Sequence, residues 1–263
     1  MLPIIVQVVL TAVILGFLYI RMIRREVPKP IGTWQALVPV LLGVVSILVS
    51  TLLTVAISMG LGLLGARVDE IGNPVVQSAV KAFVGAGLTE ELIKLLMMLL
   101  SFRLFRPKNV YEYILIGAAV GIGFTLHEEY AYAGSAVGLL RMITLGTHTA
   151  LGIVMARYLG MARYQRRTGR SGAAKRIVPA FALPVLIHTA YDACTVANPA
   201  LQGLGTGMDE TSMLFYLVAG IAAILACAVW QVVVLVKLKK RAAEYSAMKT
   251  AADDSAPPSP EPQ

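Results

Sequence analysis

Seven long apolar stretches constrain this chain more than any other feature of its sequence. Each approaches or exceeds the roughly 20 residues that a helix needs to cross about 30 Å of hydrocarbon. A segment within lipid must also satisfy its backbone hydrogen bonds internally, which favours helices. We therefore predict an all-α, polytopic membrane helix bundle, with spans at about residues 3–21, 34–63, 77–102, 111–134, 140–162, 177–197 and 211–237.

The composition indicates a membrane protein rather than a water-soluble one. Hydrophobic residues make up 57% of the 263 residues and charged residues only 14%. A net charge of +8 would suggest a nucleic-acid partner in a soluble protein. Here the basic residues form short clusters between apolar stretches, so we interpret them as topology signals and expect no nucleic-acid partner. Cys194 and Cys227 lack the spacing of a thiolate metal site.

The basic clusters predict an orientation in the membrane. They follow the first, third, fifth and seventh apolar stretches, whereas the alternate connections hold few positive charges. Because basic connections stay in the cytoplasm, the N-terminus is expected outside and the C-terminus inside. We expect an integral protein of a bacterial plasma membrane. The clusters are Arg21, Arg24 and Arg25; Arg103, Arg106 and Lys108; Arg163, Arg166, Arg167, Arg170, Lys175 and Arg176; and Lys237, Lys239, Lys240 and Arg241.

The end of the chain differs in composition from the rest. Residues 243–263 include Asp253 and Asp254, followed by a proline-rich run, and lack the apolar content to bury a core. We predict a disordered cytoplasmic tail there, and one transmembrane domain over residues 1–242.

Ionisable residues lie within four of the predicted spans. On insertion scales a charge at a helix centre costs roughly 2.5–3.5 kcal/mol, so such groups usually face one another inside the bundle. Lys94 lies three and four residues after two glutamates and can partner both. The excess acid must stay protonated, find another cation or bind a metal. The residues are Glu90, Glu91 and Lys94 in the third stretch, Glu128 and Glu129 in the fourth, His148 in the fifth, and His188 and Asp192 in the sixth.

The fourth stretch combines a carboxylate with close packing. Glu128 and Tyr132 share one helix face, whereas Glu129 and His127 must point elsewhere because adjacent residues lie about 100° apart. We expect Glu128 inward, with Glu129 or His127 nearer the outer surface or a neighbouring helix. The zinc-protease pattern His-Glu-x-x-His is absent, because Ala131 stands where its second histidine would be.

Small residues and imidazoles complete the pattern. Gly117 and Gly121, one turn apart, and nearby Gly123 allow neighbouring helices to approach closely. Each histidine alone is more often a hydrogen-bonded packing group than a ligand. Together with carboxylates they are typical zinc ligands, and Asp192, one turn after His188, suits a role in orienting that imidazole.

These residues resemble, motif by motif and in order, the PrsW family of intramembrane proteases, relatives of the CAAX-prenyl-protease and bacteriocin-processing group. The resemblance covers about residues 80–195. Glu129 is a departure, since asparagine is usual there. The motifs are Glu90-Glu91-Leu92-Ile93-Lys94, Gly123-Phe124-Thr125-Leu126-His127-Glu128-Glu129 with Tyr132, His148, and His188-Thr189-Ala190-Tyr191-Asp192.

The resemblance implies an endopeptidase that cuts a single-span or otherwise membrane-anchored protein, such as an anti-sigma factor, within or beside the bilayer. In a metal-dependent version, His148, His188 and Glu128 hold zinc, and Glu90 or Glu91 is the general base and then acid. Lys94, Tyr132 and Asp192 support these groups. In a metal-free version, one glutamate activates water directly and the histidines supply the oxyanion hole.

Two other classes of function stay open. A transporter or proton-coupled channel would use the same intramembrane groups as a relay, but the sequence has no internal repeat and no obviously broken helix pair. A catalytically silent scaffold would use them only to lock the bundle. In that case Glu90→Gln would harm folding more than any activity.

Overall fold

The computed structural model describes residues 2–26, 30–200 and 209–250, and within these residues the chain is helical without a strand. This confirms the all-α prediction. The α-helices are α1 (Leu2–Ile23), α2 (Thr33–Leu63), α3 (Pro74–Ala82), α4 (Thr89–Phe105), α5 (Val110–Tyr132), α6 (Ala136–Arg141), α7 (Thr147–Arg167), α8 (Ile177–Cys194) and α9 (Glu210–Ala247). Shorter elements are the 3-10 helices η1 (Val68–Glu70), η3 (Met142–Thr144) and η4 (Ala174–Arg176) and the π-helix η2 (Phe83–Leu88).

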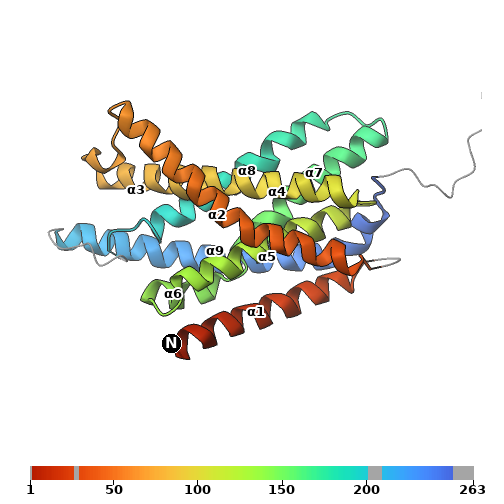
Figure 1. The fold of residues 1–263 in the computed structure, drawn as a ribbon, viewed down its shortest axis with the longest axis horizontal. Coiled ribbons are helices and arrows are strands. Elements are labelled where there is room, and N and C mark those ends of the chain that lie inside the picture. Colours follow the sequence, from red (N-terminus) through yellow and green to blue (C-terminus); the bar gives the residue numbers. More distant parts are fainter. Residues whose placement is uncertain (1, 27–29, 201–208, 251–263) are drawn as a thin grey trace, which may run out of the picture.

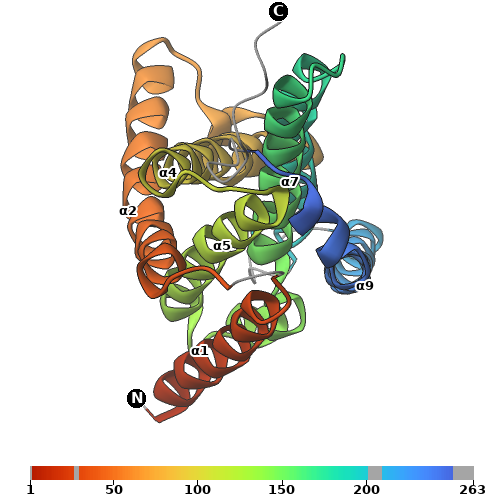
Figure 2. The same ribbon diagram turned by 90° about the vertical axis from the view of Figure 1, so that its right-hand side faces the viewer.

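Helix α5 forms the centre of the bundle. It packs most extensively against α7 and α2 and also contacts α1, α4 and α9, as Figures 1 and 2 show. In its most apolar stretch 83% of the residues are buried inside the protein, whereas the corresponding shares of α1, α2 and α9 are 22%, 17% and 22%. The apolar side chains of these outer helices therefore remain available to lipid.

Glycines bring the backbones of α2, α5 and α7 together. A methyl group at Gly117 would overlap the α7 backbone, and one at Gly121 would overlap the carbonyl of His148. On the other side of α5, a methyl group at Gly123 would overlap the carbonyl of Val40 in α2. The predicted close approach at these glycines is thus confirmed, and it places the polar end of α5 against the start of α7.

Among the described residues, five helices are long and apolar enough to cross a membrane: α1, α2, α5, α8 with the preceding η4, and α9. A bent pair, Gly138–Thr144 with Thr147–Arg167, raises the number to six if it forms one span. The expected span at 77–102 is instead divided into α3, η2 and α4, and α4 is only 17 residues long. The predicted number of seven and the orientation of the termini stay predictions.

The fifth predicted stretch, 140–162, is interrupted near Gly146, where the two helical segments meet at 40°. Gln231 of α9 donates a hydrogen bond to the carbonyl of Ile143 (2.8 Å), which satisfies an acceptor at the break. Helix α7 begins at Thr147, so His148 lies in its first turn, whereas a span that began at about residue 140 would have placed it about two turns into the helix.

The last described residues pack back onto the bundle. Helix α9 continues past the predicted end at 237 to Ala247. Thr250 then donates to the carbonyls of Pro107 (2.7 Å, from Oγ1) and Lys108 (2.8 Å, from N). Residues 251–263 of the predicted tail lie outside the described residues, and the division at residue 242 stays a prediction.

Candidate functional site

Four helices meet at a buried polar site. The rings of His148 from α7 and His188 from α8 lie with their centroids 4.9 Å apart. Glu90 and Glu91 reach them from the first turn of α4, and Glu128 from the last turns of α5. The structure thus brings all five residues predicted to be catalytic into one cluster, although their separate roles stay predictions.

Lys94 links two of these helices. Its ammonium donates to Glu91 Oε1 (2.6 Å) and to His148 Nδ1 (3.0 Å), and it lies 3.8 Å from the ring centroid of Phe124. Because His148 Nδ1 accepts this hydrogen bond, its Nε2 carries the ring proton and donates to Glu128 Oε2 (2.5 Å). The lysine therefore determines which nitrogen of His148 is protonated.

His188 lies between carboxylates on both sides of its ring. Its Nδ1 donates to Glu91 Oε1 at 2.8 Å, while its Nε2 is 3.4 Å from Asp192 and 3.7 Å from Glu90. Asp192 lies where the predicted orienting role would place it. Glu91, however, makes the shorter contact with the imidazole, so it is the stronger determinant of the ring's orientation.

Arg141, at the end of α6, is a member of the site that the sequence reasoning missed. Its buried guanidinium pairs with Glu128 (2.5 Å) and Glu129 (3.0 Å) and lies 4.8 Å from the ring centroid of Tyr132. Gln7 of α1 also donates to Glu129 (3.3 Å). The excess of acids over bases in the predicted spans, which called for a proton, another cation or a metal, was the signal that could have pointed to Arg141.

The neighbours of Glu128 point away from the histidines, as predicted. His127 is half-buried against α2, with Nδ1 3.3 Å from the carbonyl of Val44. Glu129 turns towards α1 and α6, where Gln7 and Arg141 bind it. The charge added by Glu129 is therefore compensated beside the site.

The site has unsatisfied acceptors and converging ligand atoms that fit a metal cation. Within the described part of the chain, no hydrogen-bond donor reaches Glu90 Oε2, Glu91 Oε2 or Asp192 Oδ1, although all are buried. Ligand atoms of Glu90, His148 and His188 lie within 4.8 Å of one another. A carboxylate with two imidazoles is a typical zinc donor set. The predicted set had Glu128 in place of Glu90.

A cavity of about 550 Å³ reaches the site from between α3, η2, α5 and α8. Glu90, Glu128, Tyr132 and Asp192 line it. The Glu90 side chain is 15% exposed, whereas Glu91 is fully buried and does not line the cavity. Glu90 and Glu128 are therefore the glutamates that water or a substrate can reach.

Comparisons with known proteins find relatives of this chain. A family model described as PrsW family intramembrane metalloprotease matches residues 32–227. The curated Protease PrsW of Halalkalibacterium halodurans is 29% identical over 119 residues, 43% of this chain and 54% of the relative. That of Bacillus subtilis is 28% identical over 116 residues, 42% of this chain and 52% of the relative. The chain thus spans about half the length of these relatives, and no solved structure matches it.

Membership rests on the family model, because its match extends over more than half of the chain. The same match, together with the long apolar helices, supports an integral membrane protein. All the candidate site residues lie inside the matched range, from Glu90 in α4 to Asp192 in α8. This protein belongs to the PrsW family.

Proposed function

We propose that this protein is an intramembrane endopeptidase. The observation that carries the proposal is the convergence of two imidazoles and several carboxylates beside a cavity that water can enter. Peptide hydrolysis needs an activated water, stabilisation of the oxyanion and a proton for the departing amine. Imidazoles and carboxylates supply all three, and the family described as intramembrane metalloproteases supports this chemistry here.

In the metal-dependent form of the proposal, Glu90, His148 and His188 hold the ion, with zinc favoured by the donor set. A bound zinc ion would make water acidic enough to ionise near neutral pH and would polarise the substrate carbonyl. Glu128, which the cavity exposes, takes a proton from the attacking water and returns it to the leaving amine. The sequence predicted Glu128 among the metal ligands and Glu90 or Glu91 as the general base. This assignment instead makes Glu90 the ligand and Glu128 the base.

The remaining polar residues position these groups. Glu91 accepts the Nδ1 proton of His188 and so leaves its Nε2 facing Glu90. Arg141 holds the Glu128 carboxylate at the cavity wall. Lys94 neutralises Glu91 and controls the tautomer of His148.

A metal-free mechanism is the second candidate, and the contact of Lys94 with His148 favours it. A ring that carries its proton on Nε2 donates a hydrogen bond and cannot ligate a cation through that atom. In this form Glu90 or Glu128 activates water, and His148 donates to the oxyanion. Metal binding would instead require His148 to release its Nε2 proton and Lys94 to turn fully towards Glu91.

The proposed substrate is a membrane-anchored protein with a single span, such as an anti-sigma factor, in a bacterial plasma membrane. Apolar outer helices suit a substrate that reaches the enzyme within the bilayer. The bacterial origin of the relatives supports the location.

Quantitative terminal-peptide proteomics of cell membranes tests the proposal. Cells expressing the wild-type protein are compared with cells expressing Glu90→Gln or Glu128→Gln at matched abundance. Glu70→Gln is the matched control, because Glu70 is exposed and pairs only with exposed Arg67 among the described residues. New termini near predicted spans should appear with the wild type and with Glu70→Gln alone. Equal termini in all four samples would refute proteolysis, and ion or proton flux would then be measured.

A further inference from the structure

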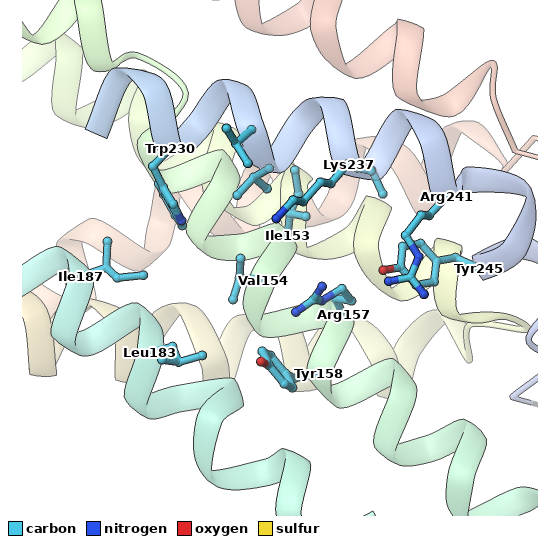
Figure 3. Close-up of a pocket in the computed structure, with 13 residues that line it drawn as sticks. Ile153, Val154, Arg157, Tyr158, Leu183, Ile187, Trp230, Lys237, Arg241 and Tyr245 are labelled. Carbon is cyan, nitrogen blue, oxygen red and sulfur yellow. The ribbon is translucent and has the colours of Figure 1, made fainter. Parts of the chain in front are cut away.

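A second pocket, apart from the candidate active site, lies between α7, α8 and α9 and holds about 270 Å³. Figure 3 shows Arg157 of α7 and Lys237 of α9 extending their charged groups into it. Arg241 contributes a third cation, and none of the 13 lining residues is acidic. The wall of this pocket therefore carries positive charge.

Two of these cations have no acidic partner among the residues that the structure describes. Arg241 is neutralised by Glu244, to which it donates two hydrogen bonds of 2.7 Å. The guanidinium of Arg157 lies over the ring of Tyr158, 4.9 Å from the ring centroid. Among residues 2–26, 30–200 and 209–250, no acidic group pairs with Arg157 or Lys237. An anionic ligand would compensate both charges.

The other end of the pocket is apolar. Figure 3 places Leu183, Ile187 and Trp230 there, away from Arg241. Ile187 and Trp230 also line an adjoining groove between α8 and α9, which holds about 490 Å³. Half of its remaining lining residues are alanines of α9. The two cavities together suit a ligand with an anionic head and a long apolar tail.

The position of the pocket suits a lipid. Arg157 lies at the middle of α7, and Lys237 and Arg241 lie in the C-terminal half of α9. The C-terminal ends of both helices are on the side that the basic clusters predict to be cytoplasmic. Anionic lipids are concentrated in that leaflet, and basic pockets between membrane helices hold their headgroups. Lys237 and Arg241 lie beyond the residues matched by the family model, so the match gives no role to either residue.

We propose that this pocket binds one anionic phospholipid. Its phosphodiester lies between Arg157, whose planar guanidinium can make two parallel hydrogen bonds to phosphate oxygens, and Lys237. An acyl chain follows the groove past Trp230. Such a lipid bridges α7 and α9, and its phosphate supplies the negative charge that no acidic group among the described residues offers to Arg157 or Lys237.

Tryptophan quenching tests this site directly. The chain has two tryptophans. Exposed Trp34 can be replaced by phenylalanine, so that the measured fluorescence comes from Trp230 alone. Trp230 lies seven positions before Lys237 on α9, which places the reporter about 10 Å from the headgroup, at the level of the acyl chain. The full-length protein is reconstituted in phosphatidylcholine containing a small fraction of brominated phosphatidylglycerol or, separately, the same fraction of brominated phosphatidylcholine.

We expect brominated phosphatidylglycerol to be enriched roughly tenfold at Trp230 over its bulk fraction. The variant Arg157→Gln with Lys237→Gln should lose this preference. The control Lys239→Gln with Lys240→Gln removes the same charge from α9 outside the pocket and should retain it. The helical circular dichroism signal of each variant verifies that it is folded. If the variant with both Arg157→Gln and Lys237→Gln does not fold, the single variant Lys237→Gln is used in its place.

Equal quenching by the two brominated lipids in the wild type would overturn the proposal without any charge variant. Equal loss in the pocket variant and the control would also overturn it, because the preference would then be only a general surface charge effect. Inorganic phosphate is added against chloride at the same ionic strength. If phosphate alone abolished the preference, the pocket would bind free anions and the lipid assignment would be wrong.

Discussion

Replacing Lys94 with methionine tests whether the buried charge network holds the site together. Lys94 is fully buried and donates to Glu91 at 2.6 Å and to His148 at 3.0 Å. Methionine keeps most of the volume but leaves the Glu91 carboxylate buried without its cation. Removing one partner of a buried ion pair costs roughly 3–5 kcal/mol. We expect a loss of that order, or a fall of about 10 °C in the melting midpoint.

A double-mutant cycle isolates this interaction. Thermal unfolding in detergent micelles is measured for the wild type, Lys94→Met, Glu91→Gln and the double variant. The double variant should recover much of the stability lost in Lys94→Met, because it no longer contains an uncompensated carboxylate. Lys81→Met is the control: Lys81 pairs with Asp69 at 2.7 Å, but both side chains are exposed, so the change should cost less than about 1 kcal/mol.

Two results would contradict this prediction: Lys94→Met melting at the same temperature as the wild type, or effects of Lys94→Met and Glu91→Gln that simply add. Either result would mean that Lys94 does not neutralise Glu91 in the folded protein. The proposed tautomer of His148, which depends on the same ammonium, would then also lose its basis.

Three further predictions concern pH, positioning and metal. Burial and, secondarily, the nearby Glu112 carboxylate raise the pKa of Glu26, which precedes α2, from its ordinary value of 4.5 to about 7. The folded protein then binds more protons than the unfolded chain between these values, so its stability should fall as pH rises from about 4.5 to 7, and Glu26→Gln should flatten that profile of melting midpoints. Arg141→Gln should reduce the yield of new termini roughly tenfold or more by releasing Glu128, and Arg141→Lys should restore only part of it, because lysine lacks the fork that binds both glutamates. Elemental analysis of the purified protein should find one zinc per chain, lost with a chelator and in His188→Ala; a metal-free protein that still cleaves its substrate would instead support the second mechanism.

The sequence predicted helices and the general location of the site because both depend on local patterns. Apolar stretches of sufficient length locate the helices, and charged residues inside them indicate where the bundle must turn polar groups inward. The helical character of all seven stretches and the inward position of Glu128 could therefore be predicted from the sequence.

What the sequence missed depends on contacts between distant segments. The break before α7 is accompanied by a hydrogen bond from Gln231, which lies 88 residues from its acceptor Ile143. The choice between Glu90 and Glu128 as the partner of the two histidines depends on how α4 and α5 are rotated about their axes. The pairing of Arg141 with Glu128 requires a short connecting helix to fold back over the site. Hydropathy and residue spacing describe a single segment, so they cannot predict how distant segments are placed relative to one another.

The glycine contacts of α5 have a mechanical consequence. Gly117 and Gly121 abut the backbone of α7, and Gly123 abuts that of α2, so α5 is clamped between main chains on opposite sides. Backbone cannot rearrange its rotamers as a side chain can, and turning α5 would drive its side chains into these walls. The Glu128 carboxylate is thus carried by a helix whose rotation is blocked on both sides. Any opening that admits the proposed substrate would therefore come from the elements around the cavity, such as α3 and η2, while Glu128 on α5 stays in place.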